Sequence, residues 1–142
     1  MILYVESSAI LSRLIGEPTS DDVAVALGNA EHVVTSVLTG VECARALTRA
    51  RHQARITSVQ ETAVLRLYAR WESTWHVAAL SGRILARAKA PLPNDAVRTL
   101  DALHIASALV VQEEVGPITV LSLDARVRGS ALALGFDVLP RG

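Results

Sequence analysis

Apolar and polar residues follow one another along the chain in two different periods, which predict strands and helices in turn. Short apolar runs at residues 2–5, 32–35, 118–123 and 136–139 are typical of buried strands. Between them, apolar residues recur at helical spacing over the ranges 7–15, 21–30, 36–51, 57–71, 79–90, 99–112 and 125–135. Because strands alternate with helices, we expect βαβ units and an α/β fold with a parallel sheet.

Local signals place several boundaries of these elements. Thr57 and Gln60 match a capping box at a helix start, and Thr99 is the expected cap of a later helix. The stretch 75–78 is ambiguous between strand and loop. The segment Pro91–Asp95, rich in proline and polar residues, is the clearest loop.

Composition places the chain among globular proteins. Its 142 residues suit one domain over 1–142, with 51% hydrophobic and 20% charged residues. No apolar run reaches the roughly 18 residues that a membrane helix needs. The chain starts directly with a strand and lacks a basic leader, so we expect no secretory signal and no membrane association.

Cysteine usage and charge bear on the cellular compartment and on the kind of partner. Cys43 is the only cysteine, which excludes an internal disulfide and suits a reducing cytoplasm. Cys43 is expected in the core, since no histidine partner suggests that its thiol is a nucleophile. The formal net charge is zero, so the overall balance does not by itself indicate a nucleic-acid partner.

Four acids fall where an α/β fold would bring side chains together. Glu6 and Asp124 follow apolar strands, and the carboxyl ends of parallel strands form the edge where ligands bind. Glu42 and Asp101 lie in helical patterns among apolar neighbours, where a carboxylate is costly to bury without a cation. Hard divalent cations such as Mg²⁺ and Mn²⁺ favour clustered carboxylates. The four acids therefore predict a metal site.

Most of these acids also have a simple structural explanation when taken one at a time. Asp124 suits a helix N-cap, and Asp101 suits a first helical turn, where the macrodipole favours a negative charge. Glu6 at a strand end is weak evidence alone. Glu42, between Val41 and Cys43, has no evident partner. The combination, rather than any one acid, favours the metal site.

Four segments carry a resemblance to a known family. Residues 1–11, 35–42, 98–106 and 121–126 read MILYVESSAIL, TSVLTGVE, RTLDALHIA and LSLDAR. In this order they resemble the signatures of PIN-domain proteins, most of all the VapC toxins of bacterial toxin–antitoxin pairs. The segments span the chain, and RTLDALH is the most specific of them.

The resemblance implies a three-layer α/β/α sandwich around a parallel sheet, with Mg²⁺ or Mn²⁺ at its carboxyl edge. It implies an endoribonuclease toxin that cleaves cellular RNA with metal-activated water and is inhibited by a cognate VapB-type antitoxin. A cytoplasmic homodimer and a toxin–antitoxin hetero-oligomer are implied as well. Residue by residue, Glu42, Asp101 and Asp124 match the family's acids, and Glu6 matches the first acid in position only.

Glu6 departs from the family pattern, which has Asp at this position. The extra methylene lengthens the side chain by roughly one bond, and Mg²⁺ tolerates misplaced ligands poorly. Three interpretations remain open: a natural variant that still binds metal, a change that weakens activity while leaving fold and partner binding intact, and an engineered change that lowers toxicity. The first is the one we favour.

Residues near the acids are candidate contacts to RNA. Arg45 and Arg49 share a helix face with Glu42, so they are predicted to hold phosphates, although a solvated or antitoxin-binding face is the alternative. Arg98, Ser7 and Ser122 are further substrate-binding candidates. His104 is expected to be a buried hydrogen-bonding residue rather than a metal ligand.

Two other functional classes compete with the ribonuclease. A receiver-type regulator also gathers acids at strand ends, but it needs a lysine after a late strand, and the only lysine, Lys89, lies in a helical pattern. A PIN-fold domain with weakened or absent catalysis, acting through partner or RNA binding, is supported by Glu6 alone. RNA cleavage in Mn²⁺ would separate this domain from the enzyme.

Overall fold

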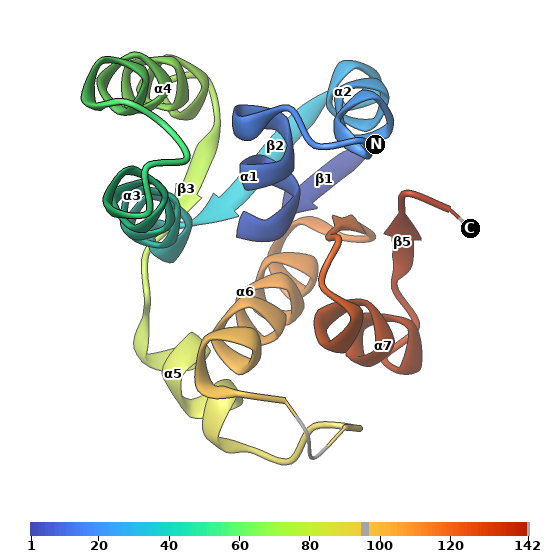
Figure 1. Cartoon of the computed structure of the whole chain (residues 1–142). Helices are drawn as coiled ribbons and strands as arrows, with labels where there is room; N and C mark the ends of the chain where they lie inside the picture. Colours follow the sequence, from blue (N-terminus) through green and yellow to red (C-terminus); the bar gives the residue numbers. More distant parts are fainter. Residues whose placement is uncertain (95–96, 142) are drawn as a thin grey trace.

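The computed structural model describes residues 1–94 and 97–141 and is built around one parallel sheet (Figure 1). Its five strands lie in the order β3-β2-β1-β4-β5. Their bounds are β1 Ile2–Val5, β2 His32–Ser36, β3 His76–Ala78, β4 Thr119–Leu121 and β5 Asp137–Leu139. The predicted α/β class with a parallel sheet is therefore confirmed.

Helices cover both faces of the sheet and make the three layers (Figure 1). Their bounds are α1 Ser7–Ile15, α2 Ser20–Asn29, α3 Val37–His52, α4 Ser58–Glu72, α5 Gly82–Lys89, α6 Thr99–Val115 and α7 Ala125–Ala133. Residues of α1 to α4 pack on one face of the sheet, whereas α6 and α7 pack on the other. Helix α5 packs against α6.

The two-residue period of β1 distributes its side chains between these layers. Leu3 and Val5 belong to the core that contains α1 and α2. Tyr4 belongs to the core under α6 and α7. The alternation therefore places a phenol beneath the helix that carries Asp101.

The register of the central strands defines the edge where the acids collect. Val5 pairs with Thr35 of β2 and with Leu121 of β4, so three strands end side by side. From β1 the chain moves to β2 and β3 on one side, and it later returns to β4 on the other. Such a switch in strand order opens a crevice at the carboxyl edge of the sheet.

Several predicted boundaries differ from the observed ones. The ambiguous stretch 75–78 contains the edge strand β3, and the predicted strand 118–123 is shortened to β4 because the chain turns away to build the site. Helix α6 extends to Val115, and Arg98 rather than Thr99 occupies its N-cap. The Thr57–Gln60 capping box is confirmed. Within the predicted loop, Asp95 lies outside the described residues.

Across residues 1–94 and 97–141, none of the helices combines the length and the apolar character that crossing a bilayer requires.

Candidate metal centre

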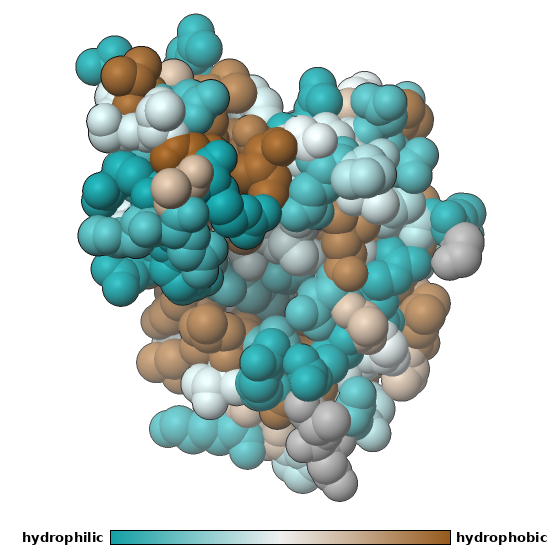
Figure 2. Space-filling model, in the orientation of Figure 1, coloured by the Kyte–Doolittle hydropathy of each residue, from teal (hydrophilic) through white to brown (hydrophobic). Residues whose placement is uncertain are grey.

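The four predicted acids reach one cleft from four different elements. Glu6 is the residue between β1 and α1, and Asp124 is the N-cap of α7. Glu42 lies in the second turn of α3, and Asp101 lies in the first turn of α6. The cleft has a volume of about 470 Å³, and all four line it. The space-filling view shows the molecule hollowed between α3 and α6 (Figure 2).

Glu6 is buried, and protein donors occupy both of its carboxylate oxygens. Oε1 accepts hydrogen bonds from Ser7 Oγ at 2.8 Å and from the Ser8 backbone N–H at 3.0 Å. Oε2 accepts from Ser8 Oγ at 2.5 Å and from Ser122 Oγ at 2.6 Å. Since a carboxylate offers about four lone-pair positions, these donors use its full capacity. Glu6 therefore serves first as a helix cap and a buried hydrogen-bonding centre.

The other three acids are only partly engaged. Asp124 Oδ1 accepts from the backbone N–H groups of Arg126 and Val127 at 2.9 and 3.1 Å, as an N-cap does. Asp101 Oδ2 accepts from the Arg98 N–H at 3.4 Å, and Glu42 Oε1 lies 2.5 Å from His104 Nε2. The second oxygen of each acid has no protein donor among the described residues. Three carboxylate oxygens are therefore left for a ligand in the cleft.

A histidine lies close to two of the acids. One ligand atom each from Glu6, Glu42 and His104 lie within 4.8 Å of one another. His104 is 1% exposed, and its other ring nitrogen, Nδ1, lies 2.8 Å from the hydroxyl of Tyr4. Both ring nitrogens thus have protein partners, which agrees with the expectation of a buried hydrogen-bonding residue.

The chemistry of this donor set fits a hard divalent cation. Burial raises the pKa of Asp101 above its ordinary value, and repulsion from Asp124 and Glu6 raises it further, whereas the backbone N–H and the charge of Arg98 oppose this. A cation placed among the acids would relieve the same repulsion. Oxygen donors from carboxylates are the ligands that Mg²⁺ and Mn²⁺ prefer.

Comparison with known proteins decides the family. The family model described as "PIN domain" matches residues 3–135 of this chain. The chain belongs to the PIN-domain family. The match covers all four acids that line the cleft, from Glu6 to Asp124.

Curated relatives of this PIN domain carry the name of one group. The chain is 31% identical over 137 residues to Ribonuclease VapC46 of Mycobacterium tuberculosis, with 96% of this chain and 95% of the relative covered. It is 32% identical over 144 residues to Ribonuclease VapC35 of the same species, with coverage of 99% and 98%. The resemblance to VapC proteins is therefore confirmed.

A solved structure supports the fold. VapBC2 from Rickettsia felis, crystallised with a DNA fragment from its promoter, matches with a TM-score of 0.64. The match covers 97% of each chain at 11% sequence identity. At that identity the likeness concerns the fold, and it agrees with the three-layer PIN architecture.

The small polar residues predicted to bind substrate contribute differently to the PIN site. Ser7 lines the cleft, but its hydroxyl donates to Glu6. Ser122 is 0% exposed, and its hydroxyl donates to Glu6 and accepts from the Asp124 N–H. Its role as a substrate contact stays a prediction. Ser122 connects the first and last acids.

The predicted arginines lie at increasing distance from the acids. Arg98 lines the cleft, and its Nε is 3.8 Å from Asp101 Oδ2. Arg45 and Arg49 are exposed on α3, over which hydrophilic side chains gather (Figure 2). Neither of these two lines the acid cleft as described; Arg49 lines a neighbouring hollow.

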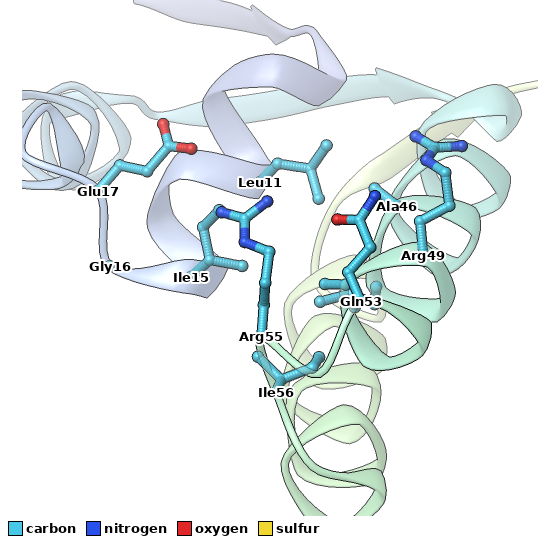
Figure 3. A pocket seen from close by; sticks show the side chains of 11 residues that line it. Leu11, Ile15, Gly16, Glu17, Ala46, Arg49, Gln53, Arg55 and Ile56 are labelled. Carbon is cyan, nitrogen blue, oxygen red and sulfur yellow. The ribbon is translucent and has the colours of Figure 1, made fainter.

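This neighbouring hollow lies between α1 and α3 and has a volume of about 500 Å³. Figure 3 shows Leu11 and Ile15 of α1 facing side chains from α3 and from the turn that follows it, among them Arg55. Leu11 also lines the acid cleft, so the two hollows adjoin at this residue. Together they extend from the acids to Arg49 and Arg55.

Tyr4 is the site residue that sequence reasoning missed. It is 1% exposed, and it reaches the site through His104. Its place in the apolar run 2–5 suggests only core packing. The available signal was the strand alternation, which turns Tyr4 toward the helix that carries His104.

Proposed function

We propose that this PIN-domain protein is an endoribonuclease toxin that depends on Mg²⁺ or Mn²⁺ and cleaves cellular RNA. The observation that carries the proposal is the cleft in which Glu42, Asp101 and Asp124 each keep one oxygen without a donor from residues 1–94 and 97–141. The names of the curated relatives, Ribonuclease VapC46 and Ribonuclease VapC35, support RNA as the substrate. Residues 1–142 form one domain in this proposal.

The three partly engaged acids would hold the cation directly or through water. When bound, such a cation stabilises charge on the scissile phosphodiester and provides a nucleophile from water. Glu6 would act by fixing the start of α1 and by adding negative charge beside the other acids. Arg98, which lines the cleft, would contact an RNA phosphate.

Arg45 and Arg49 would hold RNA outside the catalytic cleft. They lie three and seven residues beyond Glu42 on α3, so the helical period aligns them with that acid. The hollow that adjoins the cleft at Leu11 gives a single strand a path toward Arg49. Guanidinium groups along such a path suit phosphate binding.

Cleavage of total RNA by the purified chain tests the enzyme directly. We expect cleavage with Mn²⁺ or Mg²⁺, loss of cleavage with EDTA, and a loss on the order of 10²-fold or more in Glu42→Gln, Asp101→Asn and Asp124→Asn. Asp137→Asn is the control, because Asp137 is exposed at the start of β5, away from the carboxyl edge. Mapped cleavage sites would identify the target RNA. Metal-independent cleavage, or full activity in all three acid variants, would contradict the proposal.

A second candidate function is a PIN-fold domain with weak or absent catalysis that acts by binding RNA or a partner. The specific observation in its favour is the full set of four hydrogen bonds to the Glu6 carboxylate. An acid so engaged must lose a protein donor before it can bind a cation directly.

Glu6→Asp separates the two candidates. The shorter side chain cannot reach all of the serine donors, so it frees carboxylate oxygen for a cation. If Glu6 attenuates the enzyme, Glu6→Asp binds Mn²⁺ more tightly and cleaves RNA faster than the parent protein. Equal Mn²⁺ affinity and equal cleavage in both proteins would show that Glu6 causes no attenuation.

We further propose a VapB-type antitoxin as the inhibitory partner, in a cytoplasmic complex with a homodimer of this chain. The fold match to VapBC2 supports a partner of this type. Co-expression with the product of a neighbouring small gene, followed by light scattering of the purified complex, tests both points. A stable monomer that does not bind the co-expressed product would contradict both the antitoxin partner and the homodimer.

A further inference from the structure

Glu42, His104 and Tyr4 form a chain of hydrogen-bonded side chains that the proposed reaction does not explain. Glu42 Oε1 lies 2.5 Å from His104 Nε2, and His104 Nδ1 lies 2.8 Å from the Tyr4 hydroxyl. His104 and Tyr4 are each 1% exposed, whereas the Glu42 side chain is 21% exposed. The chain therefore runs from the core beneath α6 to the wall of the cleft.

The direction of the hydrogen bond between His104 and Glu42 follows from which of the two groups carries a proton. A carboxylate that binds a cation is ionised and only accepts, so with Glu42 in its proposed role the 2.5 Å contact has His104 Nε2–H as the donor. This holds for the neutral ring and for the imidazolium alike. In the neutral ring, Nδ1 is then the acceptor, and the Tyr4 O–H donates to it.

A proton on Nε2 also removes His104 from the set of metal ligands. A ring nitrogen binds a metal through its lone pair, and the lone pair of Nε2 is replaced by the bond to hydrogen. The contact of His104 with Glu42 is thus a hydrogen bond, and Glu6 lies close to the ring while its own carboxylate accepts from serine donors. The remaining role is to hold Glu42 Oε1 and leave Oε2 for the cleft.

We propose that His104, with its ring orientation set by the Tyr4 hydroxyl, is the positioning residue that orients the Glu42 carboxylate for a divalent cation. This inference deepens the proposed function and rests on it, because it takes Glu42 as a ligand. Partners that orient a ligand from behind typically change metal affinity by about 10- to 100-fold when they are removed.

Two substitutions of His104 separate orientation from packing. The amide nitrogen of Gln lies near the position of Nε2, so His104→Gln keeps a donor for Glu42. The amide of Asn lies near Nδ1, so His104→Asn keeps a partner for Tyr4 and loses the bond to Glu42. In Mn²⁺ titrations of folded protein, we expect His104→Asn to weaken Mn²⁺ binding about 10- to 100-fold. His104→Gln should keep most of the affinity of the parent chain. His52→Asn, an exposed histidine of α3, is the control.

A double-variant cycle distinguishes failure of this inference from failure of the proposed function. We expect Glu42→Gln to weaken Mn²⁺ binding and His104→Asn to add little in that background, because both act through one carboxylate. If the parent chain binds no Mn²⁺, or Glu42→Gln binds as tightly as the parent, the proposed metal role and this inference both fail. If Glu42→Gln weakens binding and His104→Asn does not, only this inference fails.

A spectroscopic measurement needs neither metal nor RNA and remains available if the His104 variants do not fold. Long-range ¹H–¹⁵N spectra should show the proton of neutral His104 on Nε2 in the parent chain. In Tyr4→Phe we expect the proton to stay on Nε2, because Glu42 still accepts it, and Mn²⁺ binding to weaken, because the ring has lost the hydroxyl that sets its orientation. Tyr68→Phe, a buried tyrosine of α4, should leave both unchanged. A proton found on Nδ1 alone, or equal losses of Mn²⁺ affinity in the Gln and Asn variants, would overturn the role of His104.

Discussion

Ser122 Oγ lies 2.6 Å from Glu6 Oε2, although 116 residues separate them along the chain. This hydrogen bond joins the end of β1 to the segment after β4, and Ser122 also accepts from the N–H of Asp124. One fully buried hydroxyl thus holds the first and the last of the four acids in register.

Ser122→Ala should lower the free energy of unfolding. The variant leaves the buried Glu6 carboxylate without one of its donors, and a hydrogen bond to a charged group contributes about 2 kcal/mol. Urea unfolding measures the change. Ser130→Ala is the matched control, because Ser130 is also 0% exposed while its hydroxyl has no partner among the described residues. Equal effects in the two variants would refute a special role for Ser122.

Asp101→Asn should raise the melting temperature of the metal-free protein at neutral pH. The pKa of Asp101 is raised in the folded state, first by burial, so ionisation of this acid opposes folding. The difference in melting temperature between Asp101→Asn and the parent should be largest at neutral pH. It should vanish once the pH falls below 3.8, the ordinary pKa of an Asp side chain. Thermal melts in EDTA across this pH range measure it.

Divalent metal should reverse the order of the melting temperatures of Asp101→Asn and the parent protein. Mn²⁺ relieves the repulsion among the acids only where the Asp101 charge is present, so it should raise the melting temperature of the parent more than that of Asp101→Asn. The exposed Asp137→Asn should follow the parent in EDTA and in Mn²⁺. An Asp101→Asn melt below that of the metal-free parent at neutral pH would contradict the assignment.

Arg45→Gln combined with Arg49→Gln should weaken RNA binding and flatten its dependence on salt. For single-stranded RNA the salt slope should fall by roughly 1.4 if each arginine meets one phosphate. Arg66→Gln with Arg70→Gln is the matched control, because these exposed arginines have the same spacing on α4. Binding by fluorescence anisotropy at several salt concentrations measures the slopes. An unchanged slope would mean that Arg45 and Arg49 do not hold RNA.

Cys43 should resist thiol reagents in the folded protein. Burial, with smaller contributions from Glu42, Glu6 and Glu72, raises the pKa of this thiol to about 12, so the reactive thiolate is scarce at neutral pH. Ellman's reagent should label Cys43 only when the protein unfolds in urea. Rapid labelling without denaturant would show that the α3 packing opens in solution.

Much of the site followed from local patterns along the chain. The apolar run before Glu6 predicted a strand that ends at this acid, and Asp124 was expected to cap a helix, as it does. These predictions succeed because strand period and capping depend on neighbouring residues. The full burial of Ser122 could not be predicted in this way, since burial depends on how β4 and β5 pack around it.

The sequence by itself determined the α/β class, the parallel sheet, the family resemblance and the four acids at the carboxyl edge, because hydrophobic period and residue type carry this information. Only the tertiary structure decided how each carboxylate is engaged. Glu6 is fully hydrogen-bonded, and Glu42 meets a histidine 62 residues away. Such contacts join side chains from separate elements, and the packing of those elements against one another sets their distances.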